Sequence, residues 1–315
     1  MNSTITAIKQ EVQKVIVGHE ELIDALIIGL ITDGHILVEG VPGLAKTTAI
    51  NALSNALGLD FKRIQFTPDL LPSDITGTEI YDQKSGEFRV RKGPAFTNLL
   101  LADEINRAPA KVQAALLEVM QERQITIGEQ TFKLDDPFLV LATQNPVEQE
   151  GAYKLPEAQL DRFMLNVIVG YNSIDEEFEI VKRVAEESFG VIHQVVTKEQ
   201  LTQLKEAVKA VHIDDAVLKY ILNIIFATRD PEKFGIPEIG NYIEYGASPR
   251  ASINIYKAVK AVAVLRGKDF VTPMDVAEVV GNVLRHRIIL NYKAEANGIT
   301  TDHIIKTIMQ HIKLP

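Results

Sequence analysis

Cysteine and tryptophan are both absent from this chain of 315 residues, and aromatic residues make up only 6% of it. Without cysteine the chain forms no disulfide and no thiolate metal site, which fits a reducing compartment. No apolar run reaches the roughly 18 residues that a membrane-spanning helix needs. The first residues also lack the basic start and apolar core of a signal peptide. From these absences we expect a cytoplasmic protein without a membrane span.

An excess of positive charge is missing as well, since the formal net charge is -9. Non-specific nucleic-acid binding depends on a basic surface, so the composition argues against nucleic acid as a partner. The residues that are present, 46% hydrophobic and 24% charged, are typical of a globular protein. The length suggests about two domains.

The most informative stretch covers residues 35–48. An apolar run ends at Gly40, a glycine-containing turn follows, and Lys46 and Thr47 open an apolar helical pattern. This order of strand, loop and helix is close to the phosphate-binding signature Gly-x4-Gly-Lys-Ser/Thr. Small residues let backbone N–H groups turn toward a phosphate, and the helix adds its positive N-terminal end. The predicted nucleotide-binding residues are Gly40, Val41, Pro42, Gly43, Leu44, Ala45, Lys46, Thr47 and Thr48.

Within this loop, Lys46 is expected to reach the β- and γ-phosphates, and the Thr47 hydroxyl is expected to bind Mg²⁺. Ala45 stands where the signature has its second glycine. Alanine tolerates a positive φ angle poorly, so we expect the loop to avoid one at this position. The competing interpretation is a tight strand-to-helix turn with a surface lysine, which the motifs below make less attractive.

Two carboxylates follow a second apolar run. Residues 98–102 are typical of a strand buried on both faces of a parallel sheet. Asp103 and Glu104 come at its carboxyl end, where open α/β sheets bind ligands. A bound cation would remove the repulsion between them. We therefore expect Asp103 to hold Mg²⁺, directly or through water, and Glu104 to polarise the attacking water.

Three further residues are candidates for the same site. Asn145 follows another buried strand, residues 138–142, and could hold the water through its amide or satisfy its own turn. Val17 and Gly18 lie upstream of the phosphate loop, where a short apolar segment either contacts the adenine base or packs in the core.

Two arginines have alternative interpretations. Arg162 could pair locally with Asp161, a contact worth little, or could reach the γ-phosphate of a neighbouring subunit. Arg250 lies in the first turn of a helix that Ser248 is expected to cap. A cation there opposes the helix dipole. Either a nearby phosphate offsets that cost or Arg250 is simply exposed.

The remaining pattern indicates an α/β fold. Residues 78–91 and 124–134 each alternate about a turn, which predicts two β-hairpins inserted into a parallel sheet flanked by helices. From residue 174 onward the pattern is helical, beginning with a connector helix over residues 174–187. We place the nucleotide-binding core at residues 1–190 and an all-helical lid domain at residues 191–315.

Taken in order, these motifs resemble those of the AAA+ ATPases, and more narrowly the MoxR-type, helix-2-insert branch. The likeness rests on residues 40–47, 102–109, 142–146 and 155–163 and extends over nearly the whole chain. The resemblance implies Walker A roles for Lys46 and Thr47, Walker B roles for Asp103 and Glu104, sensor 1 for Asn145, arginine finger for Arg162 and sensor 2 for Arg250.

The resemblance also implies ATP and Mg²⁺ as cofactors and a hexameric ring with ATP between subunits. Such ATPases act as chaperone-like remodelers of protein clients, often with partners that carry von Willebrand factor A domains, in metal-cofactor insertion or complex maturation. The alternatives are a nucleic-acid-stimulated motor, with Arg89, Arg91 and Lys92 as its basic patch, and a magnesium-chelatase-like motor subunit. A non-hydrolysing scaffold is the third, and Glu104 and Asn145 count against it.

Overall fold

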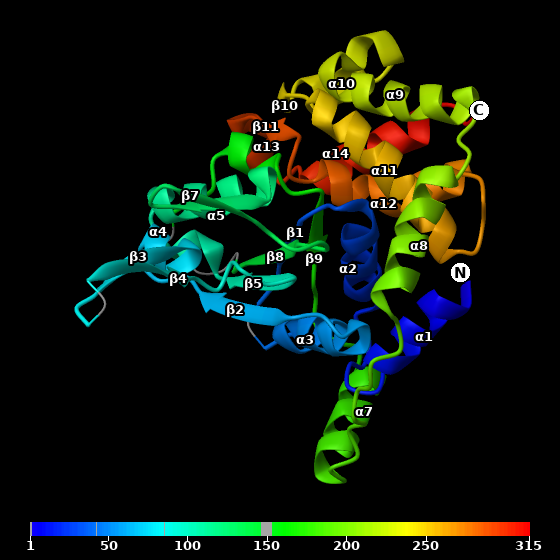
Figure 1. The fold of residues 1–315 in the computed structure, drawn as a ribbon. Coiled ribbons are helices and arrows are strands. Elements are labelled where there is room, and N and C mark those ends of the chain that lie inside the picture. Colours follow the sequence, from blue (N-terminus) through cyan, green and yellow to red (C-terminus); the bar gives the residue numbers. More distant parts are fainter. Residues whose placement is uncertain (1, 42, 85, 146–152) are drawn as a thin grey trace.

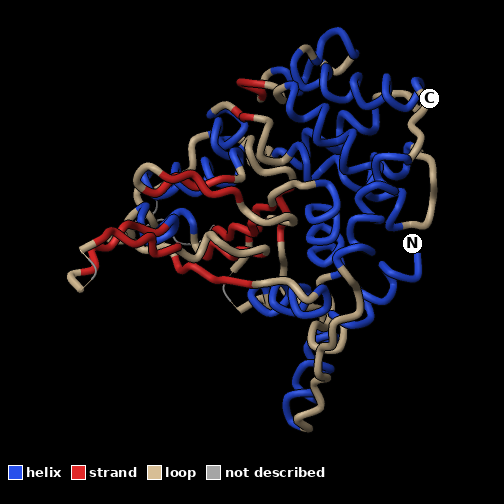
Figure 2. The backbone as a smooth tube through the Cα atoms, viewed as in Figure 1, coloured by secondary structure: helices blue, strands red, loops and turns tan. Residues whose placement is uncertain are grey.

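The computed structural model describes residues 2–41, 43–84, 86–145 and 153–315. Its centre is a parallel sheet of five strands in the order β2-β5-β8-β1-β9. Figure 2 shows the strands gathered toward one side of the molecule and most of the helices on the other. The strands of the sheet are β1 (Ile36–Glu39), β2 (Phe61–Gln65), β5 (Leu99–Asp103), β8 (Leu139–Gln144) and β9 (Leu165–Ile168).

The central strands are apolar except at their carboxyl ends, because helices cover both faces of the sheet. Alternate side chains of β5 enter different cores. Leu100 belongs to the core that includes side chains of α4 (Pro72–Thr76) and α5 (Ala110–Glu122), whereas Leu99 and Leu101 belong to the larger core that includes α2 (Glu20–Thr32), α3 (Lys46–Leu57) and the C-terminal helices. The buried strand predicted at residues 98–102 is confirmed. The helices before the C-terminal region are α1 (Asn2–Val12), α2 (Glu20–Thr32), α3 (Lys46–Leu57), α4 (Pro72–Thr76), η1 (Ile105–Arg107), α5 (Ala110–Glu122) and α6 (Glu157–Leu160).

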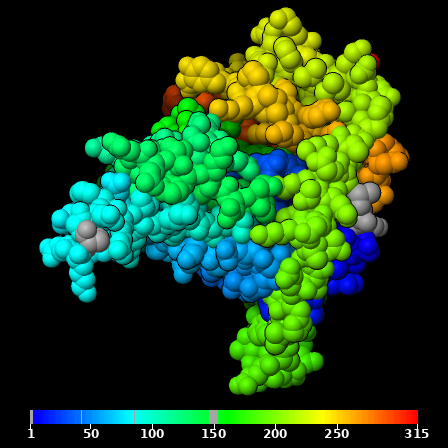
Figure 3. Space-filling view, viewed as in Figure 1, coloured from blue at the N-terminus to red at the C-terminus, as the bar shows by residue number. Residues whose placement is uncertain are grey.

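Both predicted hairpins are confirmed. The first is formed by β3 (Gly77–Asp82) and β4 (Glu87–Lys92), and the second by β6 (Gln124–Ile127) and β7 (Gln130–Lys133). The first hairpin projects from the body of the molecule (Figures 1 and 3).

The C-terminal region is mostly helical, as predicted, but it also contains a small sheet. Two short strands, β10 (Ile243–Tyr245) and β11 (Ile289–Leu290), pair in antiparallel fashion. The boundary at residues 190 and 191 stays a prediction. None of the helices in the described part of the chain is both long and apolar enough to cross a bilayer. The helices here are α7 (Ile174–Ala185), α8 (Lys198–Ala210), α9 (Asp215–Arg229), η2 (Pro231–Phe234), α10 (Pro237–Gly240), α11 (Pro249–Leu265), α12 (Pro273–Leu284), α13 (Tyr292–Ala296) and α14 (Thr301–His311).

His35 anchors the start of β1 inside the core. Its Nδ1 accepts the Val140 N–H at 3.0 Å, and its Nε2 lies 3.0 Å from the Met120 carbonyl oxygen, which it meets as a donor. The neutral ring therefore satisfies both partners. Burial lowers the pKa of His35 from 6.5 to about 4.

This shift gives a pH dependence of stability. The unfolded chain takes up a proton near pH 6.5, whereas folded His35 stays neutral down to about pH 4. The contribution of His35 to the free energy of unfolding should be complete above pH 6.5. It should decline by about 3 kcal/mol in all as the pH falls toward 4. Denaturant unfolding should show that the free energy of unfolding differs less between pH 7 and pH 4.5 for His35→Gln than for the wild type. His303→Gln, at an exposed position, serves as the control, and an unchanged difference in His35→Gln would contradict the assignment.

Candidate functional site

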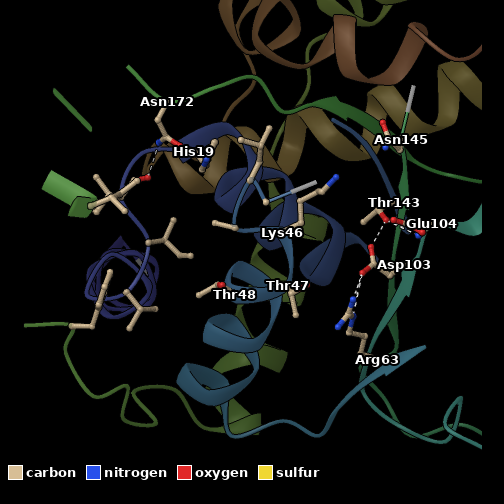
Figure 4. A pocket seen from close by; sticks show the side chains of 18 of the residues that line it. His19, Lys46, Thr47, Thr48, Arg63, Asp103, Glu104, Thr143, Asn145 and Asn172 are labelled. Atoms are coloured by element: carbon tan, nitrogen blue, oxygen red, sulfur yellow. Dashed lines mark hydrogen bonds and ion pairs between the residues drawn. The ribbon is translucent and has the colours of Figure 1, made fainter. Parts of the chain in front are cut away.

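A cavity of about 750 Å³ opens at the carboxyl edge of the sheet beside the start of α3 (Figure 4). This volume is in the range of small-molecule sites. Ten of the predicted residues line it: Val17, Gly43, Leu44, Ala45, Lys46, Thr47, Thr48, Asp103, Glu104 and Asn145. Gly40, Val41, Gly18, Arg162 and Arg250 do not line it, and Pro42 lies outside the described residues.

The phosphate loop departs from our expectation at Ala45. We predicted that alanine would avoid a positive φ, and this prediction was wrong, because Ala45 has φ 52° and ψ 13°. A left-handed conformation costs a non-glycine residue about 1–2 kcal/mol. The first turn of α3 fixes it, since the Ala45 carbonyl accepts the Ala49 N–H at 2.8 Å. Gly40 has a different role: a Cβ there would lie 2.6 Å from the Val169 carbonyl oxygen, so only glycine fits beside β9.

The start of α3 faces the cavity with donors. Ala45 precedes the helix and has no polar side chain to cap it, so the first N–H groups need another acceptor, such as a phosphate oxygen. The Lys46 Nζ donates to the Gly40 carbonyl at 2.7 Å and so lies over the loop. Burial lowers the pKa of Lys46, and the nearby carboxylates of Asp103 and Glu104 oppose that shift.

Asp103 is held from both sides. Its Oδ2 accepts from the Arg63 Nη2 at 2.6 Å, and its Oδ1 accepts from the Thr143 hydroxyl at 2.6 Å (Figure 4). The same hydroxyl oxygen accepts the Glu104 N–H at 2.8 Å. Neighbouring strands β2, β5 and β8 thus fix the two carboxylates relative to each other.

Glu104 has a strained backbone and a restrained side chain. Its φ of 55° and ψ of 51° lie in the left-handed region, a conformation that costs a non-glycine residue about 1–2 kcal/mol. Its Oε2 accepts from the Gln65 Nε2 at 2.8 Å and from the Arg107 Nη1 at 3.0 Å. Sequence reasoning missed Arg63, Gln65 and Arg107. Arg63 and Gln65 follow from the strand order, because Gln65 is directly opposite Asp103 in the β2–β5 register. Arg107 lies only three residues after Glu104.

The other end of the cavity is suited to a flat, mainly apolar group. Its wall contains Val15, Ile16 and Val17 from the α1–α2 connection and Ile180 and Phe189 from α7 and the segment after it. The Asn172 side chain donates to the Val17 carbonyl at 3.1 Å and holds this connection in place.

His19 and Gly18, both in the α1–α2 connection, have different roles. His19 lines the cavity, and its Nε2 is buried without a partner among the described residues, so it could bond the edge of a base. We did not predict it. Gly18 has φ 72° and serves the turn, since a Cβ there would lie 2.4 Å from the Glu176 Oε1.

Arg162 and Arg250 lie elsewhere. Arg162 precedes β9, and the neighbouring Met164 N–H bonds the His35 carbonyl at the start of β1, so Arg162 is at the amino edge of the sheet, opposite the cavity. Among the described residues Asp161 pairs with lid residues instead: its carboxylate lies 2.8 Å from the Arg287 Nε and 3.5 Å from the Arg250 Nη1. The anion beside Arg250 is therefore Asp161.

Comparisons with known proteins identify the family of the chain. A family model described as ATPase family associated with various cellular activities (AAA) matches residues 35–165, and an AAA lid domain model matches residues 239–308. The chain is 48% identical to Chaperone MoxR1 of Mycobacterium tuberculosis, over 97% of the chain and 81% of that protein. It is 42% identical to the uncharacterised protein YeaC of Bacillus subtilis, over 97% and 93%.

A solved structure matches the fold of the whole chain. It is the crystal structure of an ATPase candidate from Cytophaga hutchinsonii, with a TM-score of 0.94 and 51% sequence identity, and the match covers 100% of this chain and 96% of that one. Relatives of such identity match the chain along nearly its whole length, and the phosphate loop, the carboxylate pair and the helical lid are all present. The chain therefore belongs to the MoxR-type AAA+ ATPases.

Proposed function

We propose that this ATPase hydrolyses Mg²⁺-ATP to ADP and phosphate at sites shared between copies, and that it acts in the cytoplasm as a chaperone-like remodeler of protein clients. One observation carries the shared site: the cavity and Arg162 lie at opposite edges of the same sheet. Arg162 therefore cannot serve the cavity of its own chain, and a head-to-tail neighbour can bring one to it. A hexameric ring is the form of assembly that we propose.

Within one copy, the groups that line the cavity divide the work. The N–H groups of α3 and the Lys46 ammonium would hold the phosphates. Oxygen ligands suit Mg²⁺, and the Thr47 hydroxyl and the Asp103 carboxylate, which face one cavity, fit that ion. When bound, Mg²⁺ neutralises charge on the phosphate oxygens. Glu104 and Asn145 would orient the attacking water.

The client-binding surface that we propose is the β3–β4 hairpin. Ile80, Tyr81 and Phe88 are exposed on it, and the rings of Tyr81 and Phe88 lie in tilted contact with centroids 5.3 Å apart. Exposed apolar groups on a projecting hairpin suit a protein client. Arg89 of the same hairpin pairs with Asp82 at 3.2 Å, which leaves less positive charge for a nucleic acid.

The name Chaperone MoxR1 of the relative supports the remodelling role. We further propose that the client is matured or receives a metal cofactor, with a partner that carries a von Willebrand factor A domain.

The shared site has a direct test. ATP turnover per subunit should rise with protein concentration in the presence of Mg²⁺ and then reach a plateau. Arg162→Ala should lower the plateau about 10³-fold or more, the loss expected for an arginine finger, while ATP binding persists. Lys46→Ala should lose binding itself, which separates the two roles. Substantial turnover that stays constant down to concentrations where the protein is a monomer would show that each chain works alone.

A further inference from the structure

Helix α7 has its apolar side facing solvent. Ile174, Phe178 and Val181 follow helical spacing along one face, and their exposed fractions are 88%, 70% and 66%. No described side chain of this helix is buried. Figures 1 and 3 show α7 extending away from the body of the molecule beyond α1.

The inward face of the same helix makes polar contacts with the body of the molecule. The Arg183 Nη1 donates to the Gln13 carbonyl at 3.1 Å, and the Arg183 Nε donates to the Glu179 carboxylate at 2.7 Å. A surface helix of a globular protein normally has the opposite arrangement, with its apolar stripe toward the core. An inverted helix of this kind indicates that another surface covers the apolar stripe.

The position of α7 limits what that surface is. Ile180 of α7 lines the nucleotide cavity, and Phe189 after the helix lines it too. A body that covers the outer face of α7 therefore stands beside the bound nucleotide. On the proposed function, the body at that position is the next copy of this chain, which brings its Arg162.

Helix α11 has a surface that complements the α7 stripe. Arg250, Ile253 and Lys257 are exposed on one face of α11, and Ile253 is 55% exposed between the two cations. The α7 stripe is flanked by the exposed carboxylates of Asp175 and Glu177 and by the exposed ammonium of Lys182. The α7 surface is thus apolar with more carboxylates than cations at its border, and the α11 surface presents one apolar side chain between two cations, so the two surfaces are complementary in charge. Arg250 is tied to Asp161, next to Arg162, so this face accompanies the arginine finger.

We propose that the outer face of α7, formed by Ile174, Phe178 and Val181, docks on the α11 face of a second copy, formed by Arg250, Ile253 and Lys257. This inference rests on the proposed shared site. Because α7 also contributes to the wall of the cavity, the contact joins nucleotide binding to assembly.

The test uses sedimentation of the full-length chain with ATP and Mg²⁺, in a Glu104→Gln background that keeps the nucleotide intact. The double variant Phe178→Glu/Val181→Glu should need at least tenfold more protein to assemble and should keep the thermal midpoint of the parent, because both side chains are exposed. Met274→Glu, at an apolar residue of α12 that is 75% exposed, is the matched control and should assemble normally.

A charge exchange tests the α11 half of the contact. Glu177→Lys and Lys257→Glu should each weaken assembly, and the two together should restore it. A double variant no better than the single ones would overturn the α11 assignment.

Two failures are distinguishable. If the Glu104→Gln parent assembles and the Phe178→Glu/Val181→Glu variant assembles equally well, this inference is overturned and the proposed function stands. A parent that stays monomeric with ATP, while the wild type turns over at a constant rate per subunit, would overturn the shared site itself.

Discussion

Glu104→Gln should bind ATP as the wild type does and lose turnover by about 10²–10⁴-fold, the contribution expected of a positioned general base. The amide keeps the size of the side chain and can still contact Gln65 and Arg107, but it cannot accept a proton from water. The backbone of Glu104 is already held in a left-handed conformation, so the substitution changes the chemistry more than the geometry.

The measurement is phosphate release under saturating ATP and Mg²⁺, with nucleotide binding followed in parallel. Glu118→Gln, the same change at an exposed position of α5, should leave both unchanged. Full turnover in Glu104→Gln would assign the base to another residue. Loss of ATP binding together with turnover would instead point to a structural role for Glu104.

Arg287→Met should destabilise the fold by about 3–5 kcal/mol, the cost of breaking a buried ion pair from one side. The Arg287 side chain has no exposed surface, and its Nε donates to the Asp161 Oδ1 at 2.8 Å. Its other nitrogens donate to the backbone carbonyls of Asp161, Phe163, Met164 and Val283. Burial lowers the pKa of Arg287 to about 10, so the side chain remains charged at neutral pH.

Denaturant unfolding at pH 7 tests this prediction. Arg266→Met is the control, because Arg266 pairs with Glu278 at the surface, where both side chains are over a third exposed. Such a pair contributes about 1 kcal/mol or less. Equal losses in the two variants would mean that the buried contacts of Arg287 add nothing to an ordinary surface pair.

The sequence was sufficient for features that depend on local patterns. The strand, loop and helix around Lys46 and the alternation of the hairpins lie within short windows. A parallel sheet also forces strand ends to one edge, which is why Asp103 and Asn145 could be expected to line one cavity, as they do.

The features that we missed depend on which segments become neighbours. Arg63 meets Asp103 only because β2 lies beside β5. Arg287 meets Asp161 across 126 positions of the chain. The left-handed conformation of Ala45 was missed for another reason: propensity disfavours it, and the packing of the completed loop overrides a preference of about 1–2 kcal/mol.

On the proposed shared site, the location of the cavity and Arg162 at opposite edges of one sheet would give an assembly of this chain a direction. Each copy would receive an arginine from one neighbour and supply its own to a different neighbour. A pair with twofold symmetry presents the same surface on both partners, so it does not repeat this arrangement. A head-to-tail row of copies repeats the arrangement, but the site at one end of the row lacks an arginine until the row closes into a ring. Closure would therefore add a working site without adding a chain, and activity per chain would report how many rings are closed.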